Sequence, residues 1–136
     1  MNLMQFASAS LGALAHFYFA YNETIGWNED FVKRAAASWI DHNDPEAKAH
    51  IKWAKRLAFN VGIYNLVLAL GLVWTAWAAF VDSNLQEPLA IFFSIWLLLA
   101  AAAAYHTKVY IAFVFQGFLA LLLLLPLLRS ALARWI

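Results

Sequence analysis

The chain has 136 residues, of which 65% are hydrophobic and only 12% charged, with a formal net charge of +1 and a mean hydropathy of +0.67. Ordinary soluble domains are about 45–50% apolar and about 25% charged. A short chain has a large surface for its volume, and these few charges cannot cover it. The composition therefore excludes a soluble monomer and predicts a lipid bilayer as the main partner. The near-neutral charge argues against a nucleic-acid partner, and the absence of cysteine excludes disulfides.

Four stretches are long and apolar enough to be predicted as membrane spans, each of which takes about 20 largely apolar residues. They cover residues 3–21, 57–80, 88–105 and 109–128. We therefore expect an all-α fold, a four-helix transmembrane bundle in which residues 1–136 form a single integral membrane domain.

The connection between the first two spans, residues 22–56, is long and polar. Asn28 can cap a helix whose first turn is acidic, and the apolar positions that follow suit a short helix lying on lipid headgroups. The Asp-Pro-Glu sequence that begins at Asp44 predicts a second helix start. No helix breaker follows before Gly62, so we expect this second helix to run straight into the second span.

The basic residues are distributed unequally between the two sides of the predicted bundle. Two lie on the side that holds the end of the fourth span, Arg129 and Arg134. Seven lie on the side of the long connection: Lys33, Arg34, Lys48, Lys52, Lys55, Arg56 and Lys108. The positive-inside rule therefore predicts a multi-pass protein of the cell membrane with residues 22–56 in the cytoplasm and both termini outside.

Several polar side chains lie inside or at the edge of the predicted spans, where they usually face a bundle interior or a cavity. With a rise of about 1.5 Å per residue, His16 lies roughly 10 Å deeper than Glu23 on the same helix face. Tyr64, Asn65 and Gln116 lie roughly 12–13 Å in from the same cytoplasmic boundary. This common depth predicts one polar, ligand-binding site built from His16, Glu23, Asn60, Tyr64, Asn65 and Gln116.

The helical repeat assigns these residues to faces. Small residues accompany the polar ones down one face of the first helix, which lets a neighbouring helix approach closely: Gln5, Ala9, Gly12, His16, Ala20 and Glu23. Asn60 and Tyr64 share a face of the second helix, one turn apart. Asn65 points about 100° away from Tyr64, so we expect it to serve a different neighbour.

Three of the spans carry short motifs. The first-helix motif is carried by His16, Tyr18, Tyr21, Glu23 and Trp27. Residues 60–65 read Asn-Val-Gly-Ile-Tyr-Asn, and Gln116 and Gly117 form a Gln-Gly pair in the fourth span. These motifs resemble those of the small bacterial membrane proteins grouped as DUF1304, whose second-helix motif is Asn-Gln-Gly-x-Tyr-Asn, so that Val61 stands where Gln is usual. The resemblance implies a four-helix protein of the bacterial inner membrane and no settled activity.

Two function classes fit these observations, beside a purely structural subunit. In the first, a cytoplasm-facing polar cavity binds or transports a small molecule, a lipid or an ion. In the second, the chain is a membrane-embedded enzyme in which His16 and Glu23 act as an acid–base pair on an apolar substrate. The sequence has no metal-binding or phosphate-binding signature, so we expect no metal and no cofactor. The alanine run at 100–104 allows close helix approach and predicts a homo-oligomer.

Overall fold

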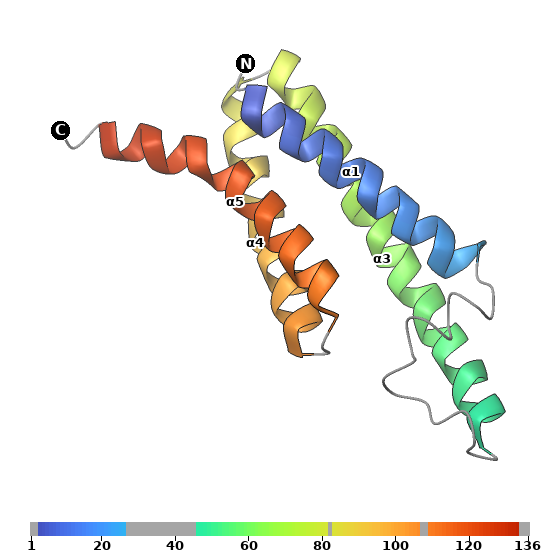
Figure 1. Ribbon diagram of the computed structural model, residues 1–136. Coiled ribbons are helices and arrows are strands. Elements are labelled where there is room, and N and C mark those ends of the chain that lie inside the picture. The colour runs from blue at the N-terminus through green and yellow to red at the C-terminus, as the bar shows by residue number, and fades with distance from the viewer. Residues whose placement is uncertain (1–2, 27–45, 82, 107–108, 134–136) are drawn as a thin grey trace. The chain divides into compact units, whose positions relative to one another are not determined.

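The computed structural model describes residues 3–26, 46–81, 83–106 and 109–133, and all regular structure in these ranges is helical (Figure 1). The helices are α1 (Leu3–Thr24), α3 (Ala47–Val81), α4 (Ser83–His106) and α5 (Tyr110–Ala133). The predicted all-α class is confirmed. The short helix expected after Asn28 lies outside the described residues.

Helix α3 is 35 residues long and continues without interruption through Gly62. This confirms that the helix beginning after the Asp-Pro-Glu sequence runs straight into the second predicted span. The predicted cap itself, Asp44, lies outside the described residues. The chain has no proline between Ala47 and Val81, so nothing in this stretch removes a backbone donor from the helix.

Three of the described helices are long and apolar enough to cross a membrane, over Lys52–Val81, Asn84–His106 and Tyr110–Ala133. They contain the second and third predicted spans and all of the fourth except residue 109. Helix α1 forms where the first span is predicted and has 22 residues, but it is not one of the three. Its polar positions, which include Gln5, Ser8 and His16, lower its hydropathy.

The chain divides into two compact units. The larger unit comprises Met1–Leu14 and Leu68–Ile136, and the smaller unit comprises Ala15–Val67. Helices α1 and α3 contribute residues to both units, whereas α4 and α5 belong to the larger unit alone.

In the larger unit, antiparallel helices enclose an apolar core in which α4 and α5 lie side by side (Figure 1). Phe6 of α1 contacts Phe80 of α3 edge to face, with ring centroids 5.1 Å apart. The core is built mostly from small and aliphatic side chains, which let helices approach closely: Ala9, Ala13, Leu72, Ala76, Ala90, Leu97, Leu119, Ala120 and Leu123.

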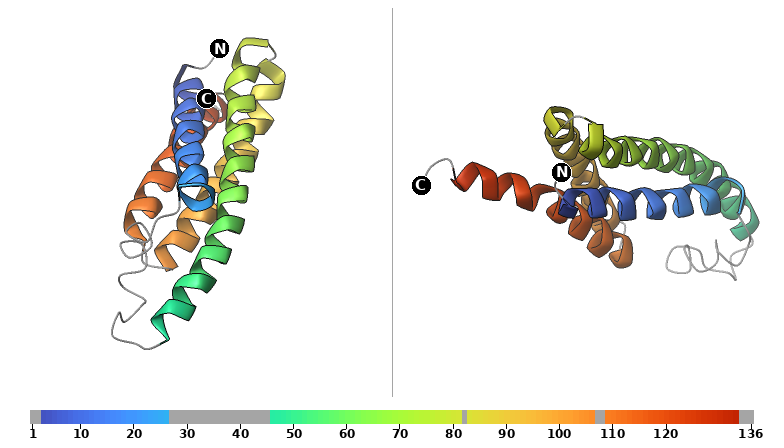
Figure 2. Two further views of the ribbon diagram at one scale, coloured as in Figure 1. Left: turned by 90° about the vertical axis from the view of Figure 1, so that its right-hand side faces the viewer. Right: turned by 90° about the horizontal axis from the view of Figure 1, so that it is seen from above.

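Two side chains of α1 bind backbone carbonyls of α5 within the larger unit. Gln5 Nε2 donates to Leu123 O at 3.1 Å, and Ser8 Oγ donates to Leu119 O at 2.9 Å. Pro126 lies inside α5, and the red end of this helix turns away from the rest of it (Figures 1 and 2). Proline removes one backbone donor from a helix and bends it.

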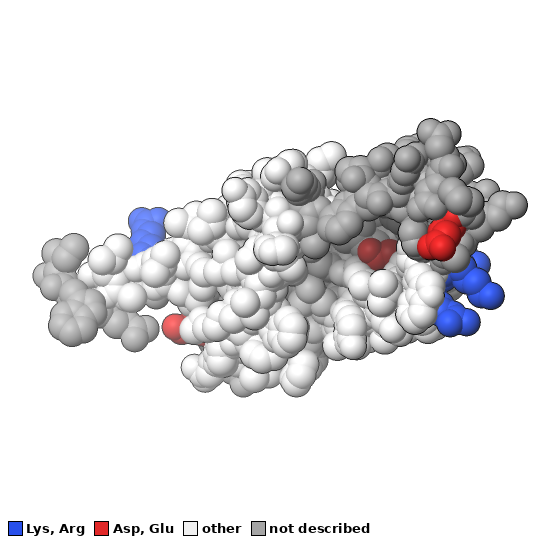
Figure 3. Space-filling view, turned by 90° about the horizontal axis from the view of Figure 1, so that it is seen from below, with Lys and Arg blue, Asp and Glu red and all other residues white. Residues whose placement is uncertain are grey.

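The exposed surface of the described helices is largely apolar. Large side chains such as Trp74, Trp77 and Ile111 are more than half exposed, and the face seen in Figure 3 carries few charged groups. Soluble proteins rarely expose contiguous apolar surface on this scale. Lipid is the solvent that such a surface requires.

Candidate functional site

A chain of hydrogen bonds joins α1 to α3 in the smaller unit. His16 is fully buried, and its Nδ1 lies 2.7 Å from Asn65 Oδ1. The amide of Asn65 also donates from Nδ2 to Glu23 Oε2 at 2.6 Å. One amide on α3 therefore connects two residues that are seven positions apart on α1. We call His16, Asn65 and Glu23 the polar triad.

The two bonds of Asn65 fix the roles of the atoms in the triad. An amide nitrogen only donates and an amide oxygen only accepts. Since the nitrogen of Asn65 faces Glu23, its oxygen faces His16, so Nδ1 of His16 carries the hydrogen. In the neutral imidazole the other ring nitrogen, Nε2, then keeps its lone pair.

Nε2 of His16 is buried and has no hydrogen-bond partner in the described part of the chain. The ring is held in place by Asn65 on one side and by Phe19, whose centroid lies 5.9 Å from that of the imidazole in an edge-to-face contact. The triad therefore presents a positioned acceptor that can take a hydrogen bond, or a proton, from another molecule.

A glycine allows α1 and α3 to approach closely beside the triad. A Cβ atom at Gly62 would lie 2.5 Å from Thr24 Cγ2, 3.0 Å from Glu23 Cβ and 3.2 Å from the carbonyl oxygen of Ala20. Only a residue without a side chain fits against this backbone. The same close approach brings Asn65, one turn further along α3, within reach of His16 and Glu23.

Glu23 lies two residues beyond the predicted 3–21 span and is partly buried. Burial raises the pKa of its carboxyl group above the ordinary value, and the hydrogen bond from Asn65 opposes this rise. Just beyond Glu23 the helix ends at Thr24, where the amides of Ile25 and Gly26 both donate to Tyr21 O.

The structure does not bring all six predicted site residues together. Asn60 and Tyr64 are exposed, Tyr64 at 72%, and neither has a described hydrogen bond to the triad. Tyr64 lies about 100° around α3 from Asn65, and Asn60 lies about 140° around from it. Gln116 is buried and belongs to the larger unit, where its Oε1 has no partner in the described part of the chain. Its place in the site stays a prediction.

Two features of the buried polar residues are not anticipated by the depth comparison. One is the pairing of Gln5 and Ser8 with carbonyls of α5. The other is Gln86 of α4, which is buried with Nε2 unpartnered among the described residues.

A signal for the contact face of α3 does exist in the sequence, as small or polar residues recur there at alternating four- and three-residue steps: Ala58, Gly62, Asn65 and Ala69.

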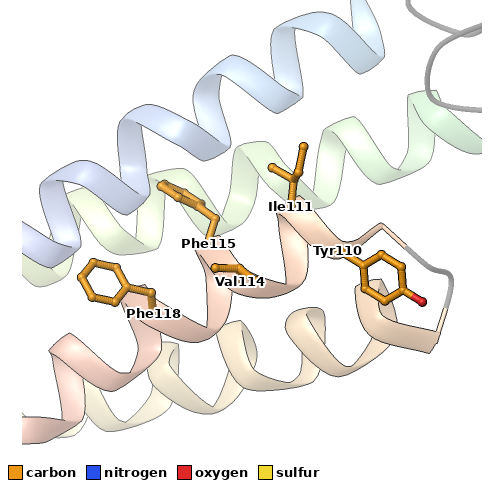
Figure 4. Close-up of a pocket in the computed structure, with 5 residues that line it drawn as sticks. All are labelled: Tyr110, Ile111, Val114, Phe115 and Phe118. Atoms are coloured by element: carbon orange, nitrogen blue, oxygen red, sulfur yellow. The ribbon is translucent and has the colours of Figure 1, made fainter.

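An apolar depression lies along α5 in the larger unit (Figure 4). Its lining residues all come from this one helix: Tyr110, Ile111, Val114, Phe115 and Phe118. It offers no converging polar groups, unlike the ligand sites of proteins, which combine apolar walls with a few placed polar ones. Among the described residues no group of three or more His, Asp or Glu side chains is placed to hold a metal ion.

An all-helical chain with three helices able to cross a bilayer and an apolar exterior is a membrane protein of the multi-span class. Residues 10–128 match the family described as "Protein of unknown function (DUF1304)", and the chain belongs to this family, as its motifs predict. The match includes every residue of the polar triad. No curated protein and no solved structure matches the chain.

Proposed function

We propose that this DUF1304 protein binds a small molecule, a lipid or an ion through the polar triad, in a cytoplasm-facing polar cavity within the membrane, and holds or transports it there. The observation that carries the proposal is the buried, unpartnered Nε2 of His16. A buried acceptor without a donor costs about 1–3 kcal/mol. A ligand that supplies an O–H or N–H group removes this cost, so the ligand is a hydrogen-bond donor.

The arrangement of the triad supports binding over a purely structural contact. One ring nitrogen of His16 is positioned by Asn65, while the other has no partner in the described part of the chain. Buried ionisable groups are costly within a membrane, and those that occur there usually mark functional sites. The other candidates from the sequence are Asn60, Tyr64 and Gln116, which we propose as further contacts of the ligand.

The proposed setting is a four-helix transmembrane bundle, with α1 as the fourth span, residues 22–56 in the cytoplasm and both termini outside. Support comes from the unequal distribution of lysine and arginine and from the packing of α1 against α5 by side-chain donors. We also propose that the protein forms a homo-oligomer, since the alanine run of α4 offers a close-packing surface.

Extraction of the purified protein tests the binding proposal. Wild type, His16→Leu and His106→Leu, a histidine exposed on α4, are purified in the same mild detergent, and organic extracts of equal amounts of protein are compared by mass spectrometry. We expect a molecule with an O–H or N–H group in wild type and in His106→Leu, and its loss in His16→Leu. Identical extracts from all three proteins would show that the triad does not retain a ligand.

A further inference from the structure

Three basic side chains occupy one face of α3 at the point where its apolar segment begins. Lys52, Lys55 and Arg56 are all exposed, and their spacing of three and four residues places them on the same side of the helix. The candidate membrane span of α3 starts at Lys52 and runs to Val81. The charged face therefore lies at one end of a 30-residue segment that is otherwise able to cross a bilayer.

No acidic residue offsets these charges along α3. The helix contains neither Asp nor Glu between Ala47 and Val81, and the nearest acidic residue in the sequence is Glu46, just before the helix begins. The structure describes one other acidic side chain in the smaller unit, that of Glu23, which accepts a bond from Asn65. Along the described part of α3, this face therefore carries positive charge alone.

An aromatic side chain stands beside the basic ones. The guanidinium carbon of Arg56 lies 5.9 Å from the centroid of the Trp53 ring, and this tryptophan is 63% exposed. Tryptophan prefers the level of the lipid headgroups, and stacking on its ring leaves the guanidinium N–H groups at the edge free to bind. A planar guanidinium matches the oxygens of a phosphate group in a two-pronged hydrogen bond.

We propose that Lys52, Lys55 and Arg56 form a binding surface for the phosphate groups of anionic phospholipids. Charge complementarity and the position at the end of an apolar segment both favour a lipid headgroup over an acidic protein segment as the occupant. Each basic residue near an anionic membrane surface contributes about 1 kcal/mol, so three together correspond to a preference on the order of a hundredfold. This surface is separate from the polar triad and does not depend on the proposed function.

Lipid titration of the full-length protein tests this surface. Phosphatidylglycerol and phosphatidylcholine with the same acyl chains are added to the detergent-purified protein, and bound lipids are counted by native mass spectrometry. We expect wild type to prefer phosphatidylglycerol, K52Q/K55Q/R56Q to lose this preference by roughly a hundredfold, and the charge-conserving variant K52R/K55R, which leaves Arg56 in place, to keep it. Arg129→Gln, which removes an exposed charge from α5, should leave the preference intact.

A second measurement keeps the test independent of how well the triple variant folds. In wild type the preference should weaken as salt is raised, because exposed charges are screened. The proposal is wrong if the preference is insensitive to salt, if K52Q/K55Q/R56Q retains it, or if Arg129→Gln loses as much. It is also wrong if K52R/K55R loses it, since the surface would then not depend on the charge of the two lysines.

Discussion

Asn65 is the residue on which the polar triad depends, because its amide makes both hydrogen bonds. Replacing it by leucine removes a donor from Glu23 and an acceptor from His16. Interhelical bonds of this kind contribute about 0.6–2 kcal/mol each in membranes, so we expect Asn65→Leu to lower the free energy of unfolding by about 1–4 kcal/mol. Thermal melts in the same detergent measure the effect.

Asn60 gives the matched control, since it is the same residue type on the same helix but is exposed. Asn60→Leu should change the free energy of unfolding by about 0.5 kcal/mol or less, as is usual for surface positions. Equal destabilisation by the two substitutions would show that the loss comes from the added leucine and not from the triad.

The pKa of Glu23 predicts how stability depends on pH. Burial raises this pKa in the folded protein above its ordinary value of 4.5. A raised pKa means that the folded state holds the proton more tightly, so the stabilisation is fully present below the ordinary value and is lost as pH rises through the folded pKa. The melting temperature of wild type relative to Glu23→Gln should therefore fall as pH is raised from about 4 toward neutrality. A constant difference between the two proteins would contradict a raised pKa.

The substitution Gln116→Leu distinguishes a Gln116 side chain that meets no ligand from one that contacts the bound molecule. Its Oε1 is buried without a described partner, and such an atom costs about 1–3 kcal/mol. If no ligand meets this oxygen, Gln116→Leu should raise the melting temperature, because the unsatisfied group is gone. If Gln116 contacts the bound molecule, the variant should instead lose whatever wild type retains in the extraction experiment.

The sequence predicts which residues are candidates at this scale, but only part of their geometry. Polar groups in apolar helices stand out by composition, and the helical repeat correctly separates the direction of Asn65 from that of Tyr64. Depth alone does not say which face of α3 meets α1. For that reason the prediction groups Asn60 and Tyr64 with Asn65, although Asn65 points in another direction. The contact face is the one that carries Gly62, where a Cβ atom would meet Thr24, Glu23 and Ala20 of α1.

At the scale of elements, the approach of α1 to α3 depends on Gly62. In Gly62→Ala the new methyl group would lie 3.2 Å from the backbone oxygen of Ala20, which cannot rotate away. Overpacking typically costs about 1–3 kcal/mol, against a gain of up to about 1 kcal/mol from the helix propensity of alanine. We expect a net loss of stability and a weaker contact between His16 and Asn65, which nitrogen-15 NMR of the imidazole detects as a changed Nδ1 signal.

Gly117 of α5 is the control for this substitution, because the nearest atom to a Cβ there is Ala101 Cβ at 4.0 Å. Gly117→Ala makes only an ordinary van der Waals contact and should raise stability by about 0.5–1 kcal/mol through helix propensity alone. Stabilisation of the protein by both substitutions would mean that α1 and α3 do not need the close approach at Gly62.

The helices themselves are largely predictable from the sequence, and their ends are less so. Runs of apolar residues predict the end of α4 and the start of α5 to within one residue, but α4 begins at Ser83, five residues before the predicted start at 88, and α5 continues past the predicted end at 128 to Ala133. Arg129 does not stop the helix, because a long cationic side chain can extend toward water from an apolar segment. Pro126 bends α5 without ending it, and the bond from Gln5 to Leu123 O cannot be read from local sequence because its partners are 118 positions apart.

For the whole molecule, the apolar exterior and the number of spans decide the topology. Three of the described helices meet the length and hydropathy that a bilayer requires. Helix α1 is not among them, because its polar residues lower its hydropathy, so experiment must decide whether it crosses the membrane. If α1 crosses the membrane, both termini lie on the side opposite to residues 22–56. If it does not, the N-terminus lies on the same side as that segment.

Cysteine labelling distinguishes these topologies, and the chain has no native cysteine to interfere. Single cysteines are introduced at Asn2, Asp44 and Asn84 and are labelled in intact cells with a membrane-impermeant maleimide. The excess of lysine and arginine on the side of Asp44 predicts protection there until the cells are opened, while the positions at Asn2 and Asn84 should react from outside. Protection at both Asn2 and Asp44 would place α1 on the cytoplasmic surface, and external labelling at both Asp44 and Asn84 would contradict a membrane-spanning α3.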